Sequence, residues 1–392
     1  MTTLTAQQAI EAARAVAATL AKDAVERDRA NAEPHAEVQL LRDAALPAIL
    51  LPREVGGSGL GWDTALRVVR EISAADGSIG QLIGYHYMNQ DLMTWLHNSD
   101  ALALWGARSA EHQWVWGDAV DVYAPAITLV EDSPGFRISG RKNFATGFSV
   151  ADVSVVAVAE SGTGSPLLVI VERTADGVAP GGDWDNLGQR LSASGSITFT
   201  DVAITPEQVL GTLDPARATP QGSLIAPVSQ AVHSEMYLGI AQGALRTAGE
   251  YTRTVSRPFL LSGVESATAD PYVLATYGRL VAAVRAVEAL ADDVGAHVAR
   301  VNAAGSDLTW DARGELAVHT SALKVVAIET VLEVTSKIFE VTGARATSNA
   351  VGLDRFWRNA RTHMLHDPVV YKQREVGAHF LTGTYPPFTV YS

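Results

Sequence analysis

Hydrophobic residues recur at intervals of three and four along the first third of the chain. The runs at about 6–30, 34–45, 62–75 and 79–96 combine these apolar stripes with good helix formers, which predicts helices. The segment between two of them, residues 51–61, carries a proline and several glycines. Its spacing matches neither the dinucleotide fingerprint nor the P-loop, so we expect a turn between helices there.

The pattern changes between about residues 113 and 210 to short apolar runs of Val, Ile, Thr and Phe, broken by Gly, Pro, Asp and Ser. Such runs predict strands, most clearly at 151–159, 167–171 and 196–199. Long helical periodicity returns at 230–256, 272–299, 312–342 and about 352–362. Strands gathered in one block, without alternating helices, favour an antiparallel β-domain between helical domains over a Rossmann sheet.

This order predicts an α+β, mainly α protein of three domains. An N-terminal helical domain is expected over residues 1–112, a central antiparallel β-domain over 113–212, and a C-terminal helical bundle with a terminal tail over 213–392. A chain of 392 residues, 47% of them hydrophobic, can bury a large core in this arrangement.

Charge and cysteine content exclude several classes of protein. The 43 acidic residues outnumber the 30 basic ones, so no broad positive surface is expected to bind nucleic acid. The chain has no cysteine, which excludes disulfides, thiolate nucleophiles and iron–sulfur clusters and makes the cytoplasm the expected compartment. Residues 1–30 show neither a signal-peptide pattern nor a long apolar span, so no membrane association is expected.

Histidines near the C-terminus are the first candidates for chemistry. His363 and His366 lie three residues apart, a spacing that places both rings on nearly the same face of a helix. Because imidazole can donate or accept a proton near pH 7, the pair is a candidate catalytic site. The same spacing fits histidines that cap a helix before Asp367 and Pro368. A metal would need further ligands, so none is expected.

Three other groups combine aromatic and polar side chains. Tyr85 and His86 lie in an apolar helical run, where they fit a pocket or equally a core with hydrogen-bonded tips. Phe144 and Thr146 put an aromatic face beside a hydroxyl just before a strand, which suits a flat ring but equally a β-turn. Arg257 offers the planar fork that binds phosphate, although a solvated surface position fits it as well.

The C-terminal segments FEVTGAR, at 339–345, and DRFWRN, at 354–359 and continuing to Lys372, resemble the acyl-CoA dehydrogenase-fold family. They are most similar to its group D flavin monooxygenase branch, which oxygenates aromatic heterocycles such as dibenzothiophene and indole, and the resemblance runs through nearly the whole chain. It implies an N-terminal helical domain, a central antiparallel β-domain, a C-terminal four-helix bundle and a homotetramer.

The resemblance also implies the activity of an oxygenase component. A separate NAD(P)H-dependent flavin reductase supplies reduced flavin, FMNH2 or FADH2. The reduced flavin reacts with O2 to give a C4a-hydroperoxide, which transfers one oxygen atom to a small hydrophobic aromatic substrate. The cofactor performs the difficult step, so the protein's task is to hold it, exclude water and supply a hydrogen-bond donor.

Roles for individual residues follow from the same resemblance. The reaction centre is expected to hold His363, His366 and Tyr85. The flavin contacts are expected to be Phe144, Thr146, Ser194, Ser196, Arg257 and Arg345, the two arginines binding phosphate. The substrate pocket is expected to hold Gln81, His86, Asp118 and Trp184.

Two of these positions depart from the family pattern. Gln81 stands where the family has a histidine, and Asp118 stands where it has an asparagine. A glutamine is no acid near neutral pH, and a carboxylate favours a substrate that carries an N–H donor. We therefore expect the flavin chemistry to be retained, while both an indole-like ring and a thiophene-like sulfur remain open as the oxygenated group.

Two other functions also remain open. A dehydrogenase of the parent fold would use a carboxylate to remove an α-proton from an acyl-CoA, and Asp367 lies near the position where one parent subgroup has its glutamate base. A flavin-binding protein without turnover would keep the fold alone. The presence of His363, His366, Tyr85 and Thr146 together argues against that reading.

Overall fold

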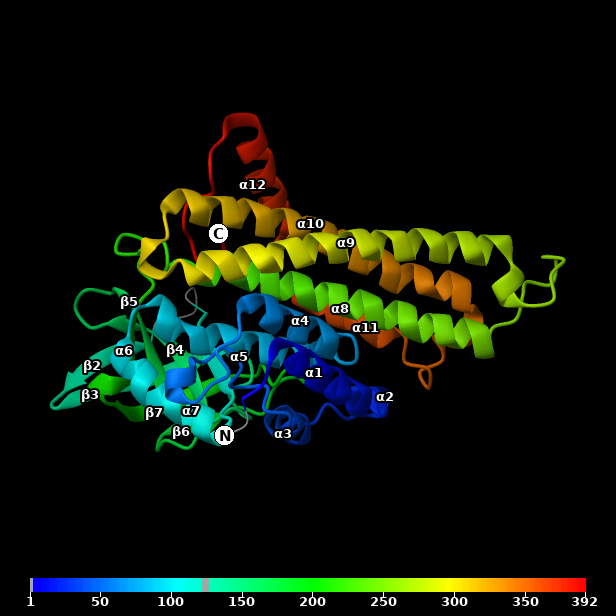
Figure 1. Ribbon diagram of the computed structural model, residues 1–392. Helices are drawn as coiled ribbons and strands as arrows, with labels where there is room; N and C mark the ends of the chain where they lie inside the picture. Colours follow the sequence, from blue (N-terminus) through cyan, green and yellow to red (C-terminus); the bar gives the residue numbers. More distant parts are fainter. Residues whose placement is uncertain (1–2, 122–126) are drawn as a thin grey trace.

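The computed structural model describes residues 3–121 and 127–392 (Figure 1). Its first part is a set of helices, and the long run expected over 6–30 is divided in two near Asp23. The turn predicted at 51–61 is confirmed, with a short 3-10 segment at Arg53–Val55. The helices are α1 (Ala6–Leu20), α2 (Ala24–Ala30), α3 (His35–Asp43), α4 (Trp62–Ser73), α5 (Gly77–Trp95), α6 (Ser99–Ala101) and α7 (Ala107–His112), with a π-helical turn at Leu102–Gly106.

Helix α5 is the central helix of this part, and nearly all its residues are buried. The Asp76 side chain caps its first turn by accepting hydrogen bonds from the backbone of Ser78 and Ile79. A Cβ atom at Gly84 would lie 2.5 Å from Val232 Cγ1, so the glycine allows α5 to approach the next long helix closely. The side chain of Tyr85 is thereby brought against that helix.

The strands form one eight-stranded sheet in the order β6-β7-β3-β2-β4-β5-β8, with β1 pairing to β4. The sheet is mixed rather than wholly antiparallel, because β1 and β2 both run parallel to β4 and follow each other along the same edge of it. The strands are β1 (Trp116–Ala119), β2 (Thr128–Asp132), β3 (Gly135–Lys142), β4 (Val153–Glu160), β5 (Pro166–Glu172), β6 (Val178–Pro180), β7 (Ile197–Ile204) and β8 (Val209–Thr212).

Three long helices, α8, α9 and α10, lie side by side above the first helices and the sheet (Figure 1). Helix α12 packs on α10 as the fourth helix and stands out from the body beside the C-terminus. No helix in the described ranges is long and apolar enough to cross a bilayer. The helices are α8 (Ile225–Thr254), α9 (Pro271–Ala303), α10 (Trp310–Thr342), α11 (Asp354–His363) and α12 (Val369–Thr382).

A buried ion pair joins α4 to α8. The guanidinium of Arg70 donates two hydrogen bonds to the carboxylate of Glu235, at 2.6 and 2.9 Å. Both side chains are almost fully buried, and Arg70 also reaches Asp292 of α9 at 2.8 Å. The pair lies within one helical turn of His233, so it fixes α8 beside the N-terminal helices at the level of the site described next.

Candidate active site

A cavity of about 510 Å³ lies between α5, the loops that flank the sheet, the start of α8 and the turn after α11. One stripe of α5 lines it, because Gln81, Tyr85, Asn89 and Leu92 recur at helical spacing. We describe the cavity in three parts, according to which of these α5 residues lies beside each part. Gln81 marks a polar end, Tyr85 a histidine-rich centre, and Asn89 with Leu92 a mainly apolar end.

At the polar end, two loops bring small hydroxyl side chains together. The Thr146 hydroxyl lies 3.0 Å from that of Ser194 and accepts a hydrogen bond from the Gln81 amide at 3.3 Å. Backbone hydrogen bonds hold the loops to each other, since Ala145 N donates to Gly195 O and Gly147 N donates to Ser192 O. The predicted flavin contacts Thr146 and Ser194 therefore share one rigid surface.

An aromatic surface lies beside these hydroxyls. Phe144 adopts a positive φ of 53° and leaves its side chain exposed toward the cavity, although it is large and apolar. Its ring meets Trp184 edge-to-face at 6.2 Å, and the Trp184 indole N–H is fixed by a 2.7 Å hydrogen bond to Gln189 O. Flat apolar faces next to fixed hydroxyls are what a planar heteroaromatic ring requires.

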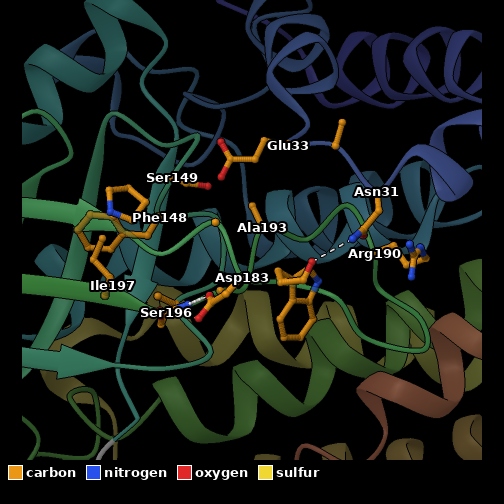
Figure 2. A pocket seen from close by; sticks show the side chains of 15 residues that line it. Asn31, Glu33, Phe148, Ser149, Asp183, Arg190, Ala193, Ser196 and Ile197 are labelled. Atoms are coloured by element: carbon orange, nitrogen blue, oxygen red, sulfur yellow. Dashed lines mark hydrogen bonds between the residues drawn. The ribbon is translucent and has the colours of Figure 1, made fainter.

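Ser196 lies in a separate small cleft (Figure 2). Its backbone N–H and hydroxyl both donate to the Asp183 carboxylate, at 2.7 and 2.8 Å. Trp184 lines both the cleft and the cavity, but Ser196 lines only the cleft. Within this chain, Ser196 therefore stabilises the loop that carries Asp183. Its contact with the flavin stays a prediction.

The centre of the cavity is a chain of tyrosines and histidines. The Tyr85 hydroxyl lies 3.1 Å from Nε2 of both His233 and His363, and the Tyr237 hydroxyl lies 2.8 Å from Nδ1 of His363. Burial, and then the neighbouring histidines, hold the pKa of His233 and of His363 well below the usual value. Both imidazoles are therefore neutral at physiological pH and act as hydrogen-bonding groups.

His366 differs from His363 because it lies beyond the end of α11, in a turn. The helical spacing predicted for the pair ends at His363, yet the two rings still stack, with centroids 5.9 Å apart and planes inclined by 6°. Nδ1 of His366 lies 3.1 Å from the Asp367 carboxylate. Among the described residues no side chain or backbone group hydrogen-bonds its Nε2, and the ring lines the cavity.

A buried lysine, Lys324, holds the carboxylate of Asp367 that bonds His366. Lys324 of α10 is fully buried and donates to both the Asp367 carboxylate and the Gln230 side chain. Burial lowers the pKa of Lys324 to about 8, against the opposing effect of Asp367. Burial alone would raise the pKa of Asp367, but His366 and Lys324 together hold it well below its usual value. Asp367 is therefore ionised and orients His366.

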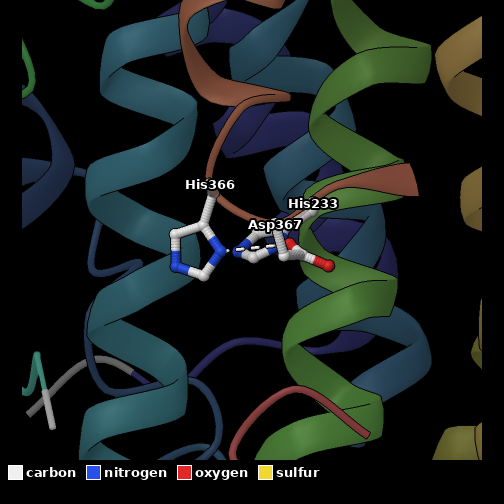
Figure 3. A group of neighbouring side chains, drawn as sticks. All are labelled: His233, His366 and Asp367. Carbon is white, nitrogen blue, oxygen red and sulfur yellow. Dashed lines mark hydrogen bonds and ion pairs between the residues drawn. The ribbon is translucent and has the colours of Figure 1, made fainter. Parts of the chain in front are cut away.

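His233, His366 and Asp367 also bring three potential metal ligands within 4.8 Å of one another (Figure 3). Nδ1 of His233 and one oxygen of Asp367 are buried without a hydrogen-bond partner. The ammonium group of Lys324, however, is bonded to that same carboxylate and would repel a divalent cation. The arrangement therefore suits proton handling better than metal binding.

The third part of the cavity holds a hydrogen-bonded acid, Asp118, beside apolar side chains. Asp118, on β1, receives a hydrogen bond from the Asn89 amide at 3.4 Å. Burial raises the pKa of Asp118 to about 7, although Asn89 and the neighbouring backbone oppose the shift. Leu92, Leu168 and Leu213 line the same end.

Besides Ser196, three predicted site residues do not line the cavity. His86 is a correction: it faces away from the cavity, and its ring bonds Pro47 O at 2.7 Å and accepts from Trp116 N at 3.0 Å, so it connects α5 to neighbouring backbone. Arg257 and Arg345 are exposed near the far end of α8, and Arg345 donates to Val255 O.

Sequence reasoning did not find several residues that complete the site. His233 and Tyr237 come from α8, and their spacing of four residues on a helical run was the available signal. Lys324 could not be found, because a lysine within a helical pattern ordinarily indicates a solvated face. Gln189 and Tyr391 line the cavity from loops that carry no periodic signal.

Two family descriptions match this chain. Residues 3–97 match the acyl-CoA dehydrogenase N-terminal domain, and residues 231–370 match the acyl-CoA dehydrogenase C-terminal domain. Together they cover most of the helices on both sides of the sheet and include Tyr85, His233, His363 and His366.

Known proteins match over almost the full length. Dibenzothiophene monooxygenase of Rhodococcus qingshengii is 39% identical, over 96% of this chain and 94% of that protein. The structure of TdsC from Paenibacillus sp. A11-2 in complex with FMN and indole has a TM-score of 0.94 and 38% identity, covering 98% of this chain and 99% of that one. The methanesulfinate monooxygenase MsuC of Pseudomonas fluorescens has a TM-score of 0.94 and 35% identity, with the same coverage.

Proposed function

Because the chain belongs to the acyl-CoA dehydrogenase family and is one of its flavin-dependent monooxygenases, we propose that it is the oxygenase component of a two-component system. A separate NAD(P)H-dependent reductase supplies FMNH2, and one atom of O2 enters a hydrophobic aromatic heterocycle. The observation that supports this most directly is the union, in one cavity, of a flat-ring surface at Phe144 and Thr146 with the oriented His366–Asp367 pair.

The polar end of the cavity fits a reduced flavin ring. The side-chain oxygens of Gln81 and Gln189 are buried there without a hydrogen-bond partner. Unpaired buried acceptors are costly unless a ligand supplies donors, and a reduced flavin ring carries N–H groups. When bound, the reduced flavin supplies the two electrons with which O2 is activated.

The chain's own residues then hold the substrate, exclude water and supply protons. The overall reaction inserts one oxygen atom into the substrate and releases the other as water while FMNH2 becomes FMN, so a proton must reach the departing oxygen. Nε2 of His366 is the group placed to hold that proton, because Asp367 occupies Nδ1. The neutral Tyr85–His363 pair holds the centre of the cavity in place.

A simple activity assay distinguishes a monooxygenase from an acyl-CoA dehydrogenase. With a flavin reductase, NADH, FMN and air, the protein is expected to give an oxygenated product from indole or a benzothiophene. Acyl-CoA is expected to leave the oxidised flavin unbleached, since His366 and Lys324 hold the pKa of Asp367 well below its usual value and so make it a weak base for removing an α-proton. Bleaching by acyl-CoA without oxygenation would contradict the proposal, and oxygen consumption that yields only hydrogen peroxide would favour a flavin-binding protein without turnover.

Arg257 and Arg345 serve the flavin phosphate in a neighbouring copy of the chain. Between His233 and the end of α8 lie roughly 30 Å of helix, at about 1.5 Å per residue. The arginines therefore cannot meet a flavin whose ring lies in their own cavity. The adjacent loop exposes Phe259, Leu260 and Leu261 at 70%, 92% and 81%, as expected of a surface that a second copy covers. This supports the homotetramer.

Arg257→Ala is expected to weaken FMN binding about tenfold, because a charged phosphate contact is lost. FMN affinity is measured by the quenching of its fluorescence, with Arg253→Ala as a control, since Arg253 is exposed and bonded to Glu250. Co-expression of Arg257→Ala with Phe144→Ala should restore a fraction of complete sites if the two residues come from different copies. No restoration would place both contributions in the same chain.

A further inference from the structure

The described residues that line the cavity carry negative rather than positive charge, which does not suit an anionic substrate. Among its described lining residues there is no lysine or arginine, whereas two, Asp118 and Asp121, are acids. Of the histidines that line the cavity, His233 and His363 supply no compensating charge, because burial holds the pKa of both well below the usual value. A sulfinate or carboxylate substrate would therefore lose its hydration without meeting a lysine or arginine among the described lining residues, and it would face two acids.

Asp118 is an acid of the cavity lining that a substrate can meet beside Asn89. The residue is 9% exposed, and its carboxylate has one side-chain partner among the described residues, the amide of Asn89 at 3.4 Å. Asn89 also donates to Gly117 O at 3.2 Å, which fixes the amide in place. The backbone of Thr146 also bonds the carboxylate, whose remaining lone pairs stay available to a ligand in the cavity that Leu92 and Leu168 line as well.

We propose that Asp118 determines specificity by accepting a hydrogen bond from the ring N–H of a neutral bicyclic heteroarene, and so selects such rings over sulfur isosteres and anions. This inference rests on the proposed function and narrows its substrate class. An indole-like ring carries the N–H donor, whereas a benzothiophene of nearly the same shape carries none. A site built to bond a donor rejects the analogue that lacks it, because its own polar group is then left buried and unpaired.

The selection depends on pH with a definite sign. Burial raises the pKa of Asp118 to about 7, so the carboxylate is mainly neutral at pH 6 and mainly ionised at pH 8. An ionised acceptor makes the stronger hydrogen bond, so preference for the N–H ring should increase over that interval. The titratable side chains that line the same cavity are Tyr85 on α5, Asp121 after β1, His233 on α8, His363 on α11, His366 in the turn after it and Tyr391 in the tail.

The test uses the full-length protein and four probes: indole, 1-methylindole, benzothiophene and methanesulfinate. Dissociation constants are measured by calorimetry at pH 6 and pH 8, and product is measured with reductase, NADH and FMN. At pH 8 indole is expected to bind about tenfold more tightly than 1-methylindole or benzothiophene, and methanesulfinate should bind most weakly. The preference should shrink at pH 6.

Two variants and a matched control assign the effect to the carboxylate. Asp118→Asn keeps the size and one acceptor, so the preference should fall severalfold and lose its dependence on pH. Asp118→Leu removes the acceptor and should favour benzothiophene. Asp91→Asn is the control, because Asp91, on α5, is another acid whose pKa is raised by burial, and it bonds Trp62 outside the cavity. The Asp91→Asn variant should show the same preference for indole over benzothiophene as the unchanged protein.

Equal binding of indole and benzothiophene, or an unaltered preference in Asp118→Asn, would overturn the selection while leaving oxygenation intact. Tightest binding of methanesulfinate would overturn it as well. The binding measurements need no turnover, so they test Asp118 even if no probe is oxygenated. If no probe is oxygenated, that result would count against the proposed function and not against the role of Asp118.

Discussion

His366→Ala is expected to divert most of the consumed O2 into hydrogen peroxide and to lower product formation by about 10²- to 10⁴-fold, the range that a positioned proton donor contributes. His366 presents Nε2 to the cavity, and its other ring nitrogen is held by Asp367. Without the imidazole, the reaction loses its proton donor while the reduced cofactor is still oxidised by O2. Product, peroxide and NADH consumption are measured together, so that uncoupling is distinguished from a loss of binding.

The control is His35→Ala, an exposed histidine outside the cavity, which should leave the ratio of product to NADH unchanged. Asp367→Asn tests the orientation of His366 separately. It should lower the product yield and alter its pH profile while leaving FMN affinity in place, because the amide no longer holds Nδ1–H as a carboxylate does. Thermal melting checks the fold, since Lys324 loses its counter-ion in this variant. Full coupling in His366→Ala would remove the residue from the mechanism.

The sequence predicted the long helices and the three clearest strands because their periodicities extend over many residues. It predicted a block of strands at about 113–210 but did not single out β1 and β2, which pair along one edge of β4 and take their structure from that partner. It also missed α12, whose packing on α10 stabilises a segment with a weak apolar stripe. The mixed sheet could not be predicted, because strand direction depends on where the chain re-enters the sheet rather than on residue type.

Much of the site was likewise accessible from the sequence, with two instructive exceptions. His363 and His366 lie together, but the helix ends at His363, and of these two only His366 keeps a ring nitrogen that no described residue hydrogen-bonds. His86 lies one residue from Tyr85 and therefore faces away from the cavity, since adjacent positions on a helix point about 100° apart. A match to a family motif shows that a residue lies close to the site along the chain. Whether its side chain reaches the ligand depends on the face of the helix on which it lies.

Arg70→Met is expected to lower the free energy of unfolding by about 3–5 kcal/mol, the usual cost of removing one partner of a buried ion pair. The substitution leaves the carboxylate of Glu235 buried, with no cation to replace the two hydrogen bonds that Arg70 donates. The adjacent surface pair offers a matched control. Arg14 bonds Glu71, the next residue on α4, but is largely exposed, so Arg14→Met should change stability by only about 0.5 kcal/mol.

The loss should also depend on pH. Burial already raises the pKa of Glu235 against the effect of Arg70, and removing the guanidinium should raise it further. An acid whose pKa is higher in the folded state loses stability as pH rises through that pKa, so the deficit of Arg70→Met should be larger at pH 8 than at pH 5. Urea unfolding at both pH values measures it. The double variant Arg70→Met/Glu235→Leu should recover much of the loss, because no buried charge then remains on α8. A deficit that is the same at both pH values, and that the second substitution fails to reduce, would show that Arg70 acts through packing or Asp292 rather than through Glu235.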